Sequence, residues 1–253
     1  MIKTINLSKD FAGAKALEKL NLHIAAGELF GFLGPNGAGK TTTIKMLTGL
    51  LRPTAGEIII NGYDIKSEPV AAKSCLGFVP DEPILYEKLS GREFLSFMAD
   101  LYKVGKKDKE ERIPELLQLF SLAERADDYI QSYSRGMRRK IAIAGALIHN
   151  PRVLLLDEPT LGLDPASARL LKDILRTLVS RGAAVFMSTH ILEIAQHMCT
   201  RVGIINQGEL IACGTMDQLR SQAQEYSLED VFLKLTGGVE HRDTIRFLRE
   251  GVE

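Results

Sequence analysis

The chain has 253 residues, enough for one large domain or for one domain with an insertion. Hydrophobic residues make up 45% and charged residues 25%, the balance of a globular protein with a substantial core. The 32 basic and 32 acidic side chains cancel, so the net charge gives no long-range attraction to nucleic acid or anionic lipid. Three cysteines without C-x-x-C spacing (Cys75, Cys199 and Cys213) indicate free, buried thiols in a reducing compartment.

No stretch of the sequence is apolar for long enough to span a bilayer. The longest uninterrupted apolar run, 141–148, contains Gly145 and is far shorter than the roughly 20 residues that a membrane helix needs. The first residues, 1–6, lack the features of a secretion signal. We therefore expect a soluble, cytoplasmic chain that contacts a membrane only through another polypeptide.

The first 85 residues are predicted to be rich in strands. Alternating or continuous apolar patterns predict strands at 3–7, 20–24, 28–33, 57–60 and 76–79. A turn around Gly13 separates the first two strands, and Asn61-Gly62 is a strong hairpin signal. A helix is expected at 42–47, and it stops near Gly49.

A helical insertion is predicted between about residues 87 and 149. Ser90-Gly-Arg-Glu93 is a capping box that opens the first helix. The charged run 106–112 indicates the solvated start of a second helix, and an apolar stripe follows at 116–120. Another helix is expected after Ser134.

From residue 152 onward, strands and helices alternate again. Strands are predicted at 153–156, 183–187, 202–205 and 209–212, and helices at 166–180 and 191–199. A short tail, 221–253, carries a second capping box at Ser227-Leu-Glu-Asp230, a helix that ends at Gly237-Gly238, and a polar helix or frayed end at 239–253. The pattern predicts an α/β domain over residues 1–220 with a mainly parallel sheet.

One segment carries a nucleotide-binding motif. Gly34-Pro-Asn-Gly-Ala-Gly-Lys40-Thr41 fits G-x-x-x-x-G-K-[ST] at every fixed position, between the strand and the helix that the motif requires. Such a loop can bind phosphate through backbone N–H groups and the helix dipole, while Lys40 reaches the β- and γ-phosphates and the Thr41 hydroxyl binds Mg²⁺. The alternative is a plain glycine turn. The residues predicted to bind nucleotide are Gly34, Pro35, Asn36, Gly37, Ala38, Gly39, Lys40, Thr41 and Thr42.

Two carboxylates, Asp157 and Glu158, follow the buried strand at 153–156. Ligands bind at the carboxyl ends of parallel strands, so we expect Asp157 to bind Mg²⁺ and Glu158 to polarise an attacking water. The alternative is a pair of helix N-cap residues. His190 ends a core strand at the same sheet edge, and we expect it to contact the γ-phosphate. The other histidines are interpreted as structural.

The order of these motifs makes residues 1–220 resemble an ATP-binding cassette (ABC) ATPase. The resemblance implies a P-loop NTPase core with an antiparallel β subdomain and a helical subdomain inserted at about 87–149. After the Walker A loop, the sequence matches the family's glutamine loop, signature, Walker B, D-loop and switch histidine at 78–81, 133–137, 154–158, 161–164 and 188–190.

This resemblance also implies a dimer, made with an identical or a different second cassette. Two cassettes would pair head to tail, with each ATP between the Walker A loop of one chain and the signature of the other. Ser134 and the N–H of Gly136 would contact the γ-phosphate across the interface, and Phe11 would stack on the adenine. Asp164 would lie at the dimer seam. Closure would complete the site and hydrolysis would reopen it.

Three positions depart from the family pattern. Asp81 replaces the expected glutamine, and its carboxylate is a possible Mg²⁺ ligand or simply the start of a proline-flanked turn. Arg135 replaces the first signature glycine and either adds a phosphate partner or crowds the approach to it. Met137 replaces the last signature glutamine. These departures bear on the rate of hydrolysis rather than on nucleotide binding.

The resemblance implies the motor subunit of a transporter, with an integral membrane permease on a separate chain. The proline-rich segment 80–86 resembles the groove that receives a permease coupling helix, and the short tail fits an exporter. The chain would then lie on the inner face of the cell membrane. One alternative is a soluble cassette that acts on ribosomes or nucleic acid, but no second cassette, coiled coil or basic stripe supports such a partner. Another is a slow regulatory nucleotide-binding module, which Asp81 and Arg135 suggest and Glu158 and His190 oppose.

Overall fold

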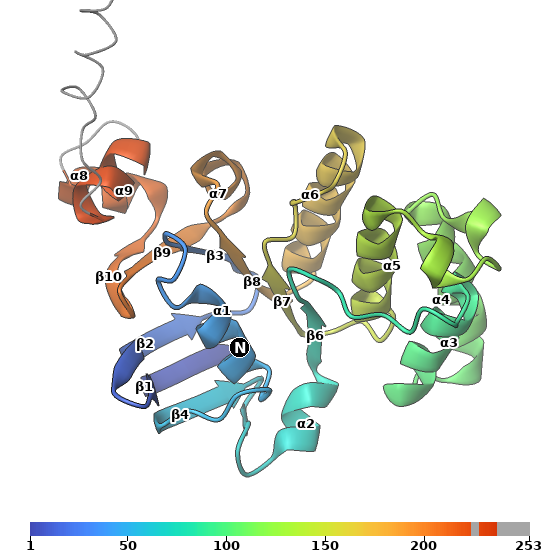
Figure 1. The fold of residues 1–253 in the computed structure, drawn as a ribbon, viewed down its shortest axis with the longest axis horizontal. Coiled ribbons are helices and arrows are strands. Elements are labelled where there is room, and N and C mark those ends of the chain that lie inside the picture. Colours follow the sequence, from blue (N-terminus) through green and yellow to red (C-terminus); the bar gives the residue numbers. More distant parts are fainter. Residues whose placement is uncertain (224–227, 237–253) are drawn as a thin grey trace, which may run out of the picture.

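The computed structural model describes residues 1–223 and 228–236 and contains two sheets with helices around them (Figure 1). The larger sheet has six strands in the order β10-β9-β3-β8-β7-β6. Five of them run parallel, and β10 joins antiparallel to β9. Its strands are β3 (Leu29–Leu33), β6 (Leu76–Val79), β7 (Val153–Asp157), β8 (Ala184–Thr189), β9 (Arg201–Asn206) and β10 (Glu209–Gly214). The predicted α/β class with a mainly parallel sheet is confirmed.

The smaller sheet is antiparallel and has four strands in the order β2-β1-β4-β5. They are β1 (Ile2–Phe11), β2 (Ala14–Ile24), β4 (Ala55–Ile60) and β5 (Tyr63–Asp64). The predicted hairpin signal between β4 and β5 is confirmed: Asn61 and Gly62 have φ angles of 51° and 93°, the two positive values that a type I′ turn requires.

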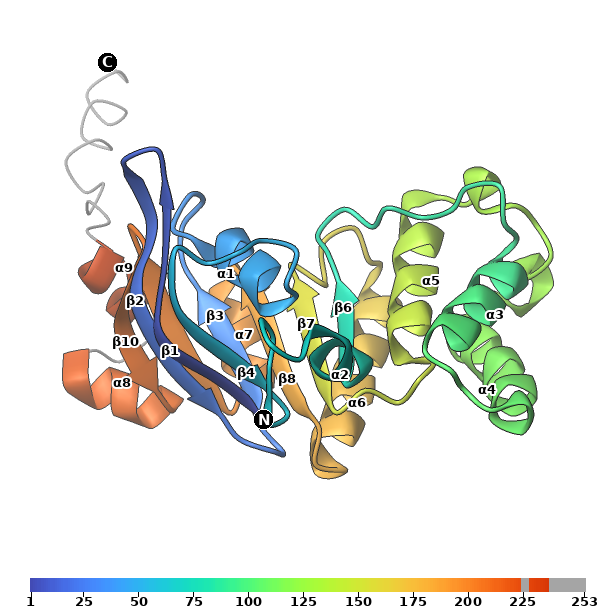
Figure 2. The same ribbon diagram turned by 90° about the horizontal axis from the view of Figure 1, so that it is seen from below.

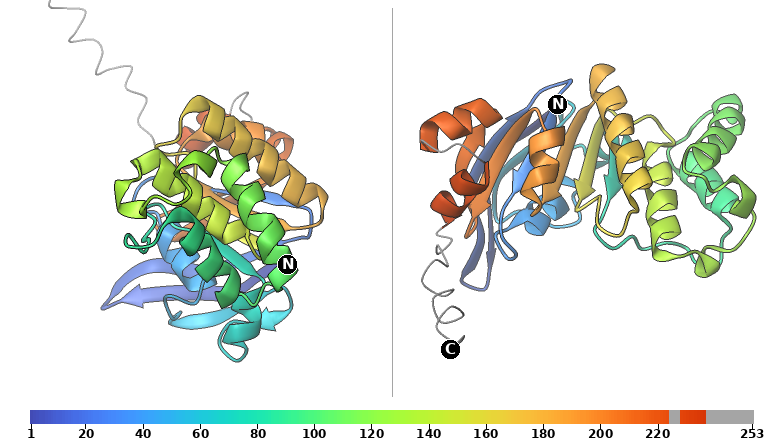
Figure 3. Two further views of the ribbon diagram at one scale, coloured as in Figure 1. Left: turned by 90° about the vertical axis from the view of Figure 1, so that its right-hand side faces the viewer. Right: turned by 90° about the horizontal axis from the view of Figure 1, so that it is seen from above.

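The larger sheet is buried on both faces because the side chains of its strands alternate. On β7, Val153 and Leu155 belong to the core that includes α1 (Lys40–Leu47) and the antiparallel sheet. Leu154 and Leu156 belong to the opposite core. There they pack with residues of α5 (Arg135–Leu147) and α6 (Pro165–Ser180). Figure 3 shows α6 and α7 (Leu192–Met198) over the face of the sheet opposite α1.

The inserted helices form a lobe beyond the β6 edge of the larger sheet (Figures 1 and 2). They are α3 (Gly91–Leu101), α4 (Lys106–Leu119) and α5, with short 3-10 turns at Ala123–Arg125 and Ile130–Ser132. The predicted capping box is present: Ser90 Oγ accepts from the Glu93 N–H, and the Ser90 N–H donates to the Glu93 carboxylate at 2.8 Å. The predicted charged run and apolar stripe belong to one helix, α4, which includes Pro114.

Two helices were not predicted from the sequence. Short α2 (Pro69–Ser74) begins with a proline, and α8 (Met216–Ala223) crosses the expected start of the tail at 221. Helix α9 (Leu228–Thr236) follows, as expected for the tail, and Leu219, Leu228 and Val231 form part of a third apolar cluster. The rest of the tail prediction, with Ser227, Gly237-Gly238 and 239–253, lies outside the described residues.

None of the helices in the described ranges has the length and apolar character that crossing a membrane requires. The three cysteines are free thiols, as predicted, but each is half-buried rather than fully buried. Burial raises the pKa of the Cys199 thiol to about 12.

Candidate functional site

The glycine-rich loop joins the end of β3 to the start of α1, as predicted. Gly37 and Gly39 have φ angles of 80° and 110°, a left-handed backbone that glycine adopts without steric cost. A Cβ atom on Gly39 would come within 2.7 Å of the Ala16 carbonyl oxygen, and one on Gly34 would collide with the Ile205 carbonyl oxygen. Glycine is therefore required here both for the backbone conformation and for the close packing of the loop.

A hollow of about 210 Å³ opens in front of this loop. Because Gly39 caps α1 without a side chain, N–H groups of the first turn have no side-chain partner at this end of the helix. Such an end of a helix attracts anions. The hollow is lined by Ala16, Asn36, Gly37, Gly39, Lys40, Thr41, Thr42, Asp81, Asp157 and Glu158.

Lys40 lies within this hollow and is only 7% exposed. Its Nζ donates to the carbonyl oxygens of Gly34 at 2.7 Å and Pro35 at 3.1 Å. Burial lowers the pKa of Lys40, and the nearby Glu158 and Asp157 carboxylates oppose that shift. The ammonium group is therefore held at the loop by carbonyl oxygens, close to two acidic side chains.

Asp157 reaches the hollow through the alternation of β7. It lies two residues after Leu155, on the face of the sheet that packs against α1. Asp157 pairs with Ser188 across β7 and β8, and the Ser188 hydroxyl donates to Asp157 Oδ1 at 2.5 Å. Ser188 was predicted only as part of the switch segment, yet it fixes the orientation of this carboxylate.

Glu158 leaves the strand with a φ of 47°, a left-handed conformation that is uncommon for a residue with a Cβ. Its N–H donates to the Ser188 carbonyl oxygen at 3.2 Å. Glu158 Oε1 lies 2.8 Å from His190 Nδ1. The other carboxylate oxygen, Oε2, is buried and has no hydrogen-bond partner within the described part of the chain. That oxygen remains available to accept a proton or a hydrogen bond from a bound water.

His190 contacts the hollow indirectly, through Glu158. It follows β8, its side chain is 46% exposed, and the lining of the hollow does not include it. If His190 Nδ1–H donates to the Glu158 carboxylate, Nε2 of a neutral ring carries no proton and can only accept a hydrogen bond. A hydrogen bond from Nε2 to a phosphate oxygen therefore requires the doubly protonated ring.

A further residue at the site was not predicted. Arg139 on α5 is 3% exposed, and its guanidinium donates to the carbonyl oxygens of Pro80, Asp81 and Glu158. Its Nη2 also lies 3.6 Å from Asp81 Oδ1. One sequence pattern could have indicated that Arg139 is buried: it lies at helical spacing from the apolar residues Ile143 and Ala146. In the structure all three residues are buried.

The predicted signature residues lie outside the hollow of their own chain. Ser134 is exposed and caps α5, its Oγ accepting from the Met137 N–H at 3.3 Å. Arg135 is also exposed, and Gly136 lies in the same first turn. Phe11, at the end of β1, is 48% exposed with Lys9 Nζ 4.8 Å from its ring centroid. None of these four residues lines the hollow in front of the glycine-rich loop.

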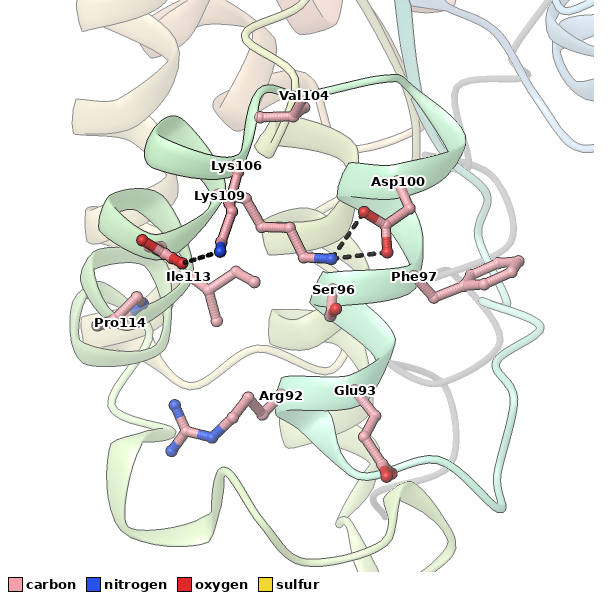
Figure 4. A pocket seen from close by; sticks show the side chains of 11 residues that line it. Arg92, Glu93, Ser96, Phe97, Asp100, Val104, Lys106, Lys109, Ile113 and Pro114 are labelled. Carbon is pink, nitrogen blue, oxygen red and sulfur yellow. Dashed lines mark hydrogen bonds and ion pairs between the residues drawn. The ribbon is translucent and has the colours of Figure 1, made fainter.

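A hollow larger than this one lies elsewhere, between α3 and α4 in the helical lobe (Figure 4). It has a volume of about 820 Å³, and none of the predicted site residues lines it. Lys109 crosses it to form an ion pair with Asp100 at 2.6 Å. Volume alone therefore does not identify the functional site in this protein.

Comparison with known proteins agrees with the motifs. The family model described as ABC transporter matches residues 17–161, more than half of the chain. The linearmycin resistance ATP-binding protein LnrL of Bacillus subtilis (strain 168) is 39% identical over 222 residues, which are 88% of this chain and 71% of that protein.

Two solved structures have the same fold. An ATP-binding subunit of an ABC transporter matches with a TM-score of 0.90 and 34% identity, over 93% of this chain and 99% of that one. The ATP-binding cassette MJ0796, solved as a dimer in a post-hydrolysis state bound to ADP and Pi, matches with a TM-score of 0.78 and 27% identity, over 85% and 98%. The chain therefore belongs to the ABC transporter family, as one of its ATP-binding cassettes.

Proposed function

We propose that this chain hydrolyses ATP to drive an exporter whose permease is a separate membrane protein. One observation carries the proposal: Lys40, Asp157 and Glu158 line one hollow beside a glycine-rich loop, and His190 from a third segment pairs with Glu158. The relative LnrL is named for resistance to linearmycin, which supports outward transport.

The loop and its surroundings have the groups that a nucleoside triphosphate needs. Backbone N–H groups from Gly37 to Lys40 would bind phosphate oxygens, with the Lys40 ammonium on the β- and γ-phosphates. Phe11 would stack on the adenine. It pairs with Ala14 at the end of the β1–β2 hairpin, and Ala16 on β2 lines the hollow.

Mg²⁺ fits the oxygen donors of the hollow. The Thr41 hydroxyl and the Asp157 carboxylate line it together with Asp81, whose Oδ1 is buried and has no hydrogen-bond partner among the described residues. Hard oxygen ligands of this kind suit Mg²⁺, which would neutralise phosphate charge when bound. Thr41, Asp157 and Asp81 are the residues that would hold it.

Glu158 would act as the general base. Its unpartnered Oε2 can accept the proton of an attacking water, while His190 holds Oε1 and would contact the γ-phosphate. The carboxylate is 9% exposed, so little bulk water competes for it. This arrangement favours turnover over a purely regulatory role.

A second cassette would complete the site. The exposed N-terminus of α5 carries Ser134, Arg135 and Gly136, and none of the three lines the hollow of its own chain. This placement is expected for groups that act on a partner's ATP. The dimeric MJ0796 structure supports such pairing for a related fold. Asp164, exposed at the N-terminus of α6, would lie at the seam.

The permease would dock beside the nucleotide. A hollow of about 630 Å³ includes Thr41, Asp81 and Asp157, which also line the nucleotide site, and Leu50, Ile84 and Tyr86, which are 67%, 97% and 59% exposed. Exposed apolar side chains at this density mark an interaction surface. Its apolar lining would receive a helix from the permease and keep the chain at the inner face of the membrane.

The substitution Glu158→Gln tests the function. The amide keeps the shape of the side chain but cannot take a proton, so we expect ATP binding within about two-fold of wild type and a loss of turnover of at least about 100-fold. ATP should then trap a dimer, which size-exclusion chromatography with light scattering would detect. The matched control is Glu57→Gln, an exposed glutamate on β4.

Two results would contradict the proposal. Turnover by the Glu158→Gln protein within a few-fold of wild type would remove the role of the base. A protein that stays monomeric with ATP and yet hydrolyses it at full rate would remove the role of the second cassette.

A further inference from the structure

Arg139 links three segments that are distant in the sequence. It lies on α5, yet its Nη1 donates to the carbonyl oxygens of Pro80, at 3.0 Å, and of Asp81. Its Nη2 donates to the carbonyl oxygen of Glu158. One guanidinium therefore connects the helical lobe to the loop after β6 and to the residue that would act as the base.

The surroundings of Arg139 are built for a guanidinium. The side chain is 4% exposed, and burial lowers its pKa while the neighbouring Asp81 carboxylate opposes that shift. A buried charge is costly unless it is paired, and here carbonyl oxygens and one carboxylate surround it. Only a planar fork with several donors can reach these acceptors together, which a lysine ammonium cannot do.

The same helix carries Ser134 at its N-terminus. Arg139 follows five residues later, about 7.5 Å along the helix axis, so the two side chains move as parts of one rigid element. Ser134 is exposed and does not line the hollow of its own chain, whereas Arg139 is buried and bonded to the backbone of Glu158. A shift of α5 that moves Ser134 would therefore also act on the Glu158 carbonyl through Arg139.

The Glu158 backbone is sensitive to such a shift. Its φ of 47° is unfavourable for a residue with a Cβ, so the conformation depends on the contacts that hold it. Those contacts are the hydrogen bonds from its N–H to Ser188, the bond that its carbonyl accepts from Arg139, and the turn bond from the Leu161 N–H at 3.2 Å. Only the bond from Arg139 comes from the helical lobe.

We propose that Arg139 is a positioning residue that makes the orientation of Glu158 depend on the position of α5. This inference rests on the proposed head-to-tail dimer, in which Ser134 contacts the ATP of the partner. Docking of Ser134 at the partner's site would then set the carboxylate at the chain's own site. Arg139 would couple the two ATP sites and make hydrolysis cooperative in ATP.

The test is Arg139→Lys in the full chain, which keeps the positive charge and loses the fork. We expect kcat to fall by about 10- to 100-fold, the usual result of a small misplacement of a reacting group. Cooperativity in ATP should be lost, while the Kd for a fluorescent ATP analogue stays within about two-fold because Lys40 and the loop are untouched. In the Glu158→Gln background the same substitution should lower residual turnover no further, because Arg139 acts through Glu158.

The matched control is Arg138→Lys, the adjacent arginine. Arg138 also bonds to carbonyl oxygens, of Tyr133 and Gln131, and to Glu87 at 2.6 Å, but all of its partners lie before α5 and none belongs to the strand end that carries Glu158. We expect it to leave kcat and cooperativity unchanged. Thermal denaturation of both variants separates positioning from a general loss of stability.

The outcomes distinguish this inference from the proposed function. If wild type dimerises with ATP and hydrolyses it cooperatively but Arg139→Lys does the same, only the positioning role is wrong. If Arg139→Lys loses ATP affinity and melting temperature in proportion to kcat, Arg139 supports only the fold and the inference is also wrong. If wild type does not dimerise with ATP, the proposed function itself fails.

Discussion

Asp157 and Glu158 show how one backbone angle assembles a site. In a regular strand, consecutive side chains point to opposite faces, so Glu158 would point away from the glycine-rich loop that Asp157 faces. The positive φ at Glu158 ends this alternation, and both carboxylates line the same hollow. The left-handed conformation has a cost on the order of 1–2 kcal/mol, which the hydrogen bonds that Glu158 donates to Ser188 and accepts from Arg139 offset.

His149 leads to a prediction about acid stability. Its ring stacks on Tyr102 with a centroid separation of 3.7 Å, and neither ring nitrogen has a hydrogen-bond partner in the described part of the chain. Burial lowers the pKa of His149 to about 4, and Arg112 contributes. Between about pH 6.5 and pH 4, the unfolded chain therefore binds a proton at His149 that the folded chain does not bind. The stability that depends on the neutral His149 ring is complete above pH 6.5 and is lost as the pH falls.

We expect the free energy of unfolding to fall on the order of 2 kcal/mol more in wild type than in His149→Phe when the pH drops from 7 to 4.5. Phenylalanine keeps the stacked ring but cannot take a proton. Urea denaturation at the two pH values measures the difference. The same pH dependence in both proteins would show that His149 is not responsible.

At the scale of the element, α3 allows a clean test of helix capping. Ser90 is 6% exposed, and its two hydrogen bonds with Glu93 satisfy the backbone N–H groups of both residues at the helix start. We expect Ser90→Ala to lower the free energy of unfolding by about 1 kcal/mol and the melting temperature by about 2–4 °C, with ATP affinity unchanged because the cap lies in the helical lobe. Ser90→Thr, which keeps the hydroxyl, is the control. An unchanged melting temperature for Ser90→Ala would contradict the capping role.

Local patterns predicted most of these elements because the signals are themselves local. The Ser90 capping box, the Asn61-Gly62 turn and the alternation on β7 depend on neighbouring residues, and the structure agrees with each. The role of Arg139 depends on carbonyl oxygens 59, 58 and 19 positions away, which no short pattern encodes. Helix α2 was missed for a different reason, since six residues are too few for a clear helical period.

The sequence motifs of the candidate site could be assigned, but the side-chain pairs within it could not. The glycine-rich loop and the two acids could be assigned because each motif lies at a sheet edge that the topology fixes. The pairing of His190 with Glu158, and of Ser188 with Asp157, could not, because it depends on the register between β7 and β8. Sequence spacing alone does not give that register.

At the scale of the whole molecule, the hollow beside the glycine-rich loop and the predicted signature turn lie on separate parts of one chain. The hollow is built from the sheet edge and α1, whereas Ser134 lies exposed at the start of α5. Figure 2 shows α5 in the helical lobe, apart from α1. A chain with zero formal net charge has no overall repulsion against a second copy. Head-to-tail pairing would therefore bring each half of the site to its counterpart.

This arrangement predicts that two inactive variants restore activity when mixed. Glu158→Gln would remove the proposed base, and Ser134→Arg would block the proposed contact with the partner's ATP, so each variant alone would have two defective sites per dimer. In a mixed dimer both defects fall on one site and the other site is intact. Random pairing makes half of the dimers mixed, so we expect about a quarter of wild-type ATPase activity if the sites act independently, and less if they are coupled. A mixture of Glu158→Gln with Lys40→Ala is the control, because these defects lie on the same side of the interface and leave no intact site. A Ser134→Arg mixture that is no more active than this control would contradict the prediction that one intact site works while the other site of the dimer is disabled.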